Sequence, residues 1–236
     1  MNSIKNMQAF TRLIGYCTGL GGKYNPGRPT LQVDELQAQL EAVRQALEEV
    51  KETKVHFYDE VNARKQAFDA LPKLAASVIR ALKAYGASEE KMSDARLYFR
   101  NLTGRMLRSN PIPKAGEAAV EPVPVKRSYL QLAYVNKADW FEQLVETVST
   151  QTGYQPNEPE LTIEGLNAKV KELHAFNQRV VDARVKWSYA RMQRDKLMFG
   201  ENGSMRMTCR AVKNYLGAIF GFNSPEYDQV KGINIG

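Results

Sequence analysis

Apolar residues recur every three or four positions along two long stretches of the chain. Across residues 36–71, nine of the eleven positions that step alternately by four and by three carry apolar side chains. This spacing predicts an amphipathic helix of about 40 residues with coiled-coil-like packing. Residues 166–198 show the same spacing and predict a second long helix. Pro72 ends or kinks the first helix, and the glycines of residues 200–203 end the second.

The two long stretches belong to a sequence repeat with an offset of 130 residues. Six identities carry it: Tyr24/Tyr154, Pro26/Pro156, Pro29/Pro159, Leu31/Leu161, Leu36/Leu166 and Ala38/Ala168. At the same offset, the sequence from Arg80 to Tyr85 returns as the sequence from Arg210 to Tyr215 with conservative changes. We therefore predict a first copy over residues 1–108 and a second over 136–236, joined by a Pro-rich linker and extended segment over 109–135.

Each long helix is preceded by the pattern Tyr-x-Pro-x-x-Pro. The prolines favour extended backbone, and Thr162 is a good N-cap for the second helix. Leu161 and Leu166 have the spacing of a hydrophobic staple, which Leu31 and Leu36 repeat. The same pattern could instead serve as a ligand for a proline-recognition module. We favour the start of a helix, because the repeat keeps the staple leucines together with the prolines.

Shorter helical segments surround the long ones. They are expected near residues 3–18, 73–86, 136–150 and 204–220, with a basic helix from Ser88 to about Arg108. Strand signals are weak, and the sequence does not decide whether residues 128–135 are strand, coil or helix. The prediction is an all-α fold: an elongated helical bundle of two pseudo-symmetric repeats, each with one long central helix.

Composition and charge narrow the class of protein. The 236 residues contain 33 Lys plus Arg against 26 Asp plus Glu, a net charge of +7, and 43% are hydrophobic. These values fit a folded protein and exclude collagen-like or wholly disordered chains. Two cysteines cannot build a disulfide framework. No apolar run has membrane-spanning length and no signal peptide is evident, so a cytoplasmic location is expected.

Four cations occupy positions of the long helices where apolar residues are expected. Lys54 and Arg64 in the first copy align with Arg184 and Arg194 in the second. Their long stems can extend out of the packing or reach a carboxylate of another helix, and we favour this interpretation. The alternative is an inward-facing anion site.

Basic residues also gather in two segments. Residues 179–213 hold nine Lys or Arg against three Asp or Glu, and residues 91–108 are basic as well. Such surfaces suit nucleic acid, although no known nucleic-acid-binding motif accompanies them and a solvated helix face is the favoured explanation. The candidate contacts for a polyanion or another partner are Arg80, Lys83, Arg206, Arg210 and Lys213.

No catalytic, metal or cofactor site is predicted. His56 and His174 lie at non-equivalent positions of the long helices, and no cysteine lies three or four residues from either. Glu52, Asp59 and Glu60 have that spacing from His56, but they belong to a run of charged residues typical of a solvated face. Neither histidine is therefore predicted to be a metal ligand or a general base.

The pattern Tyr-x-Pro-x-x-Pro-x-Leu, at Tyr24 and again at Tyr154, resembles that of a group of duplicated helical proteins found in bacteria, for which no activity is known. The resemblance implies a duplicated helical fold and no catalytic residue. We expect a non-enzymatic structural or interaction protein whose partner is another protein. Nucleic-acid or polyanion binding is the alternative, membrane activity of residues 216–222 is a weaker one, and a homo-oligomer is compatible with the pattern.

Overall fold

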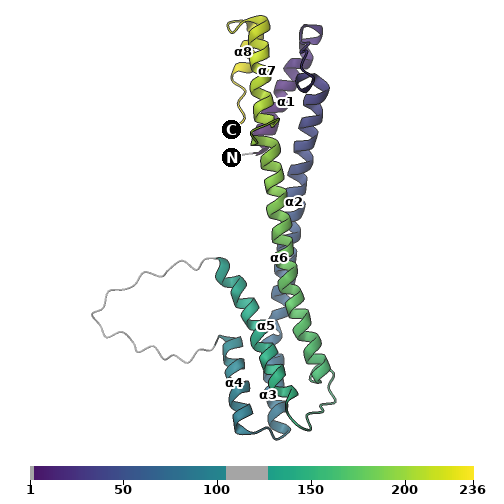
Figure 1. Cartoon of the computed structure of the whole chain (residues 1–236), viewed down its shortest axis with the longest axis vertical. Coiled ribbons are helices and arrows are strands. Elements are labelled where there is room, and N and C mark those ends of the chain that lie inside the picture. Colours follow the sequence, from purple (N-terminus) through teal and green to yellow (C-terminus); the bar gives the residue numbers. More distant parts are fainter. Residues whose placement is uncertain (1–2, 105–126) are drawn as a thin grey trace, which may run out of the picture. The chain divides into compact units, whose positions relative to one another are not determined.

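The computed structural model describes residues 3–104 and 127–236, and within these ranges it is helical without a strand (Figure 1). The all-α prediction is therefore confirmed. The helices are α1 Ser3–Gly19, α2 Val33–Asp69, α3 Leu71–Ala84, α4 Glu89–Thr103, α5 Arg127–Ser149, α6 Ile163–Phe199, α7 Met205–Phe220 and α8 Pro225–Lys231. Two short 3-10 helices, η1 Gly21–Lys23 and η2 Pro29–Leu31, precede α2. The predicted linker over 109–126 lies outside the described residues.

The two predicted long helices are present. α2 and α6 each contain 37 residues, and their bounds differ by the same 130 positions as the sequence repeat. α2 ends at Asp69, and Pro72 then lies in the first turn of α3, where its missing N–H costs no helical hydrogen bond. α6 ends at Phe199, directly before Gly200. The duplication itself stays a prediction from the sequence.

Two boundaries differ from the prediction. The expected extended segment is helical over residues 127–135, because α5 begins at Arg127 and no glycine or proline interrupts the chain before Ser149. The basic helix α4 ends at Thr103 rather than near Arg108. Gly104 has a left-handed backbone with φ of 69°, a conformation that glycine adopts readily and that ends a helix.

The same tyrosine contact precedes both long helices. The hydroxyl of Tyr24 donates to the carbonyl oxygen of Leu31 at 2.7 Å, and the hydroxyl of Tyr154 donates to that of Leu161 at 3.0 Å. Before α6, the backbone N–H of Gly165 also donates to the hydroxyl of Thr162 at 3.1 Å, which confirms the expected N-cap. Each tyrosine thus fixes the turn that leads into a long helix.

The described chain forms two compact units. Unit 1 comprises residues 1–57 and 183–236, and unit 2 comprises residues 58–182. The boundaries fall within α2 and α6, so each unit contains segments of both predicted sequence copies. The copies 1–108 and 136–236 are therefore not the compact units of the fold.

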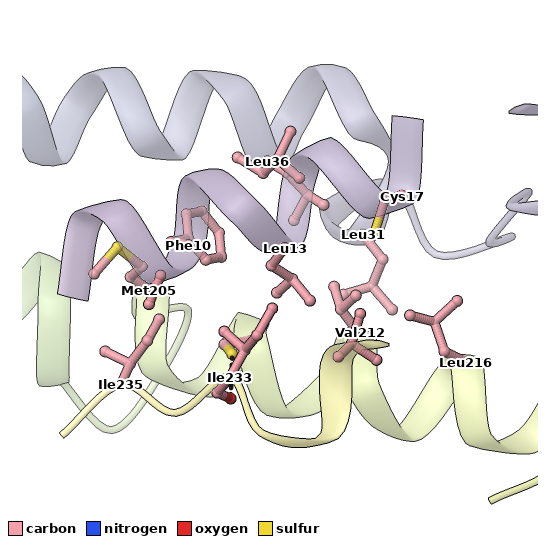
Figure 2. Packing of buried hydrophobic residues seen from close by; sticks show 14 of the residues in the cluster. Phe10, Leu13, Cys17, Leu31, Leu36, Met205, Val212, Leu216, Ile233 and Ile235 are labelled. Atoms are coloured by element: carbon pink, nitrogen blue, oxygen red, sulfur yellow. Dashed lines mark hydrogen bonds between the residues drawn. The ribbon is translucent and has the colours of Figure 1, made fainter. Parts of the chain in front are cut away.

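The hydrophobic core of unit 1, here core 1, joins the beginning of the chain to its end. Figure 2 shows Phe10 and Leu13 of α1 beside Val212 of α7 and Ile233 of the C-terminal segment. The segment is held further by a hydrogen bond of 2.8 Å from the Asn6 side-chain amide to the carbonyl oxygen of Gly236. Core 1 therefore needs residues from both predicted copies.

The core of unit 2, here core 2, is built in the same composite way. α4 packs on both α3 and α5. Fully buried side chains come from α3 and α4 of the first copy and from α5 and α6 of the second; they include Val78, Leu102, Phe141, Leu144 and Leu166. α5 and the first half of α6 thus complete a core that the first copy begins.

The two thiols lie inside core 1, and we expect them to resist a disulfide reagent at about pH 8. Cys17 and Cys209 are buried, and burial raises the pKa of both thiols, that of Cys17 to about 11. Because the thiolate is the reactive form, native labelling should be far slower than labelling of guanidinium-unfolded protein. Equal rates in the two states would contradict the packing of core 1.

The same pKa shift implies an alkaline loss of stability. The Cys17 pKa is above its unfolded value of 9.0, so the protonated thiol's contribution to the free energy of unfolding is complete below about pH 9. It is lost as pH rises towards 11. The variant Cys17→Ala should therefore lose less stability than the wild type between about pH 8 and pH 10 in urea unfolding.

Candidate functional site

The four cations of the long helices are divided between the two units. Arg64 belongs to unit 2, whereas Lys54, Arg184 and Arg194 belong to unit 1. Lys54 and Arg184 are exposed. Arg194 is half-buried and donates from Nε at 2.9 Å and from Nη2 at 2.6 Å to one carboxylate oxygen of Asp195. Asp195 is the next residue on α6, so this carboxylate does not come from another helix as the favoured interpretation expected.

Arg64 has a different environment. Its side chain is buried, with 5% of the residue exposed, and its guanidinium carbon lies 4.3 Å from the centroid of the Tyr134 ring. The buried Nε–H has no hydrogen-bond partner. Burial lowers the pKa of the Arg64 guanidinium, and the nearby Tyr134 side chain acts against this shift. Arg64 is thus a buried cation that makes no ion pair with a carboxylate of the described residues.

Two further polar groups lie around Tyr134 in unit 2. The ammonium of Lys137 lies 5.7 Å from the centroid of the same ring. The buried side chain of Asn177 donates from Nδ2 to the carbonyl oxygen of Tyr134 at 3.3 Å, and its Oδ1 has no hydrogen-bond partner. A buried donor and a buried acceptor without partners therefore both border Tyr134.

The predicted polyanion contacts are divided between the units. Arg80 and Lys83 are exposed on α3 in unit 2. In unit 1, Arg206 donates to the carbonyl oxygen of Phe199 at 3.0 Å. Lys213 donates to the carbonyl oxygen of Ile233 at 2.8 Å.

The contacts of unit 1 give these cations a structural role. Arg206 satisfies a carbonyl at the C-terminal end of α6, a position that favours cations. Lys213 also reaches Oδ1 of Asn234 at 3.0 Å, so it holds the C-terminal segment against α7. Arg210, by contrast, is exposed.

A histidine and two acids, which sequence analysis did not connect, lie together in unit 2. His174 of α6 places Nε2 at 3.1 Å from a carboxylate oxygen of Glu142 of α5, and Asp139 lies one turn before Glu142. One ligand atom from each residue lies within 4.8 Å of the others. Such a set can hold a metal ion, and it can equally be an ion pair at the surface. No sequence spacing links the three residues, because the two acids lie on α5 and the histidine lies on α6.

α6 carries a second apolar face in unit 1. Val185, Tyr189 and Met192 follow the helical spacing i, i+4, i+7 and are 62%, 58% and 63% exposed. Ala183 and Ala190, on the opposite side of the helix, are buried. We call Val185, Tyr189 and Met192 the α6 stripe. The stripe was not predicted, because only the apolar residues of the buried face of this helix were considered, although the three residues have helical spacing in the sequence.

Comparisons of the chain with protein-family models, with curated proteins and with solved structures give no match. Among the described helices, none combines the length and the apolar character that crossing a membrane requires.

Proposed function

We propose that the chain is a non-enzymatic interaction protein that binds an amphipathic helix of another protein along the α6 stripe. The exposed side chains of Val185, Tyr189 and Met192 carry this proposal. Scattered apolar residues are normal on a surface, but three large ones in helical register form a continuous strip that water solvates poorly. Tyrosine and methionine are also enriched in protein interfaces.

The charges beside the stripe indicate the chemistry of the partner. Lys186 and Lys196 are exposed and lie within one turn of Tyr189 and Met192, respectively. The acids at similar spacing, Asp182 and Asp195, already accept hydrogen bonds from Gln178 and Arg194. A partner helix with apolar residues at i, i+3, i+4 and i+7 and acidic residues at its margins would be complementary in both respects. A second copy of this chain is the competing occupant, and the crosslinking experiment below distinguishes it from a different protein.

The alternative, polyanion binding through Arg80, Lys83, Arg206, Arg210 and Lys213, stays a prediction. It requires cations that are available to phosphates, and two of these five side chains donate to backbone carbonyls of the chain itself. A steep fall of affinity with salt would distinguish it from binding along the apolar stripe.

Site-specific photo-crosslinking tests the proposal. A photoreactive phenylalanine derivative placed at Met192 should form an adduct with one protein in cell extract, whereas the same group at Glu49, an exposed position of α2 in unit 1, should not. The crosslinked segment is then made as a peptide and titrated into the purified protein. Its affinity should fall roughly 30-fold in Tyr189→Ala, the cost of an aromatic hot spot, and less than about twofold in Glu49→Ala.

Three results would count against the proposal. Equal adducts at Met192 and Glu49 would mean that the stripe has no special partner, and a peptide whose affinity is unchanged in Tyr189→Ala binds elsewhere. A crosslinked dimer of the chain would assign the stripe to a second copy instead.

A further inference from the structure

We propose that Arg64 binds a small oxyanion of the phosphate type on its buried guanidinium in unit 2. This inference is independent of the α6 stripe, which lies in unit 1. Arginine stays protonated in proteins, so burial of Arg64 places a permanent positive charge in a region of low polarity. A buried charge without an opposite charge is strongly destabilising, and an ion that binds there removes this cost.

The sequence repeat provides an internal comparison for this site. Arg64 and Arg194 occupy equivalent positions, 130 residues apart, but the next residue is Lys65 in one case and Asp195 in the other. The carboxylate of Asp195 takes two hydrogen bonds from Arg194, including one from Nε. At Arg64 the same Nε–H has no partner, and the neighbouring side chain is a cation. The carboxylate that Asp195 supplies to Arg194 therefore has no counterpart among the described neighbours of Arg64.

The neighbours of Arg64 add to the attraction for an anion. The Tyr134 ring covers the guanidinium, which orients it and partly compensates its charge. Lys137 brings a second positive charge to the same ring. Glu60 lies one turn before Arg64 on α2, but no ion pair joins the two in the described part of the chain. Tyr134 and Lys137 are only half-buried, so the site lies at the margin of core 2.

A phosphate group fits these requirements better than a chloride ion. Its oxygens match the planar fork of a guanidinium, which binds oxyanions through two parallel hydrogen bonds. At neutral pH a phosphate also keeps a proton, which it can donate to an acceptor. The side-chain oxygen of Asn177 is such an acceptor: it is buried and without a partner, on a side chain that donates to the backbone carbonyl of Tyr134.

The test is a titration of the 15N-labelled full chain with inorganic phosphate, at constant ionic strength maintained with chloride. The Nε–Hε signal of Arg64, assigned by its loss in Arg64→Met, should shift and saturate below about 20 mM phosphate, and phosphate should raise the melting temperature. The melting temperature of Arg64→Met should not respond. Arg194→Met, the equivalent change at a paired arginine, should respond like the wild type.

A pair of substitutions at Lys65 keeps the proposal testable even if Arg64→Met fails to fold. Lys65 is exposed, so both changes should be tolerated. Lys65→Asp supplies the carboxylate that Arg194 has and should weaken phosphate binding at least tenfold, whereas Lys65→Asn removes a positive charge without supplying a carboxylate and should weaken it less than about threefold. The proposal is overturned if the Arg64 signal does not saturate, if Lys65→Asp binds phosphate like Lys65→Asn, or if Arg194→Met loses binding.

Discussion

A polypeptide that ends at residue 108 should not fold as an independent domain, although it contains the whole first sequence copy. In core 1 it lacks α7 and the C-terminal segment, which supply Met205, Val212 and Ile233. In core 2 it lacks α5 and the beginning of α6, which supply Phe141 and Leu166. Helices that cannot bury their apolar faces are marginal in water, so we expect low helicity and no cooperative thermal transition by circular dichroism.

The complementary experiment is coexpression of fragment 1–108 with fragment 127–236. Together the fragments contain every buried residue of both cores, so they should copurify in equal amounts and regain a cooperative transition. The linkage between them would then be needed only to raise their effective concentration. If fragment 1–108 alone gives a cooperative transition and protected amides, the predicted copies are domains after all.

This composite arrangement explains why the helices could be predicted and the units could not. The spacing of apolar residues showed which face of α2 is buried, and the structure confirms that Leu36, Val43 and Phe68 lie in the interior. Periodicity does not say which helix covers that face. Leu36 and Val43 belong to core 1, which α7 helps to close, whereas Phe68 belongs to core 2 with α5. One helix thus takes partners from a distant part of the sequence at both of its ends.

The candidate site shows the same limit at single residues. Arg64 and Arg194 both occupy positions where the pattern predicts apolar residues, and their equivalence in the repeat suggested equivalent surroundings. Burial depends on the neighbouring helix instead: Tyr134 of α5 covers Arg64, while Arg194 turns to Asp195 on its own helix. The difference between Lys65 and Asp195 is present in the sequence. It indicates an unpaired charge only because the structure shows that Arg64 is buried.

Substitution of the paired leucines at the starts of the long helices should have the largest effect of any single change considered. Leu36 and Leu166 are fully buried, each as the second leucine of a hydrophobic staple. Leu36→Ala and Leu166→Ala should each lower the free energy of unfolding by about 2 to 5 kcal/mol, because the change loses apolar burial and leaves a cavity. Leu97→Ala, at a position 45% exposed on α4, should cost less than about 1 kcal/mol.

Native-state hydrogen exchange can locate each effect as well as measure it. Leu36 lies in core 1 and Leu166 in core 2, so Leu36→Ala should speed exchange first in α1 and α7, and Leu166→Ala first in α3, α4 and α5. If the two units unfold together, each variant should lower the free energy of exchange of all these helices by one and the same amount. Faster exchange of α4 and α5 alone in Leu36→Ala would contradict the assignment of Leu36 to core 1, because neither helix contributes to that core.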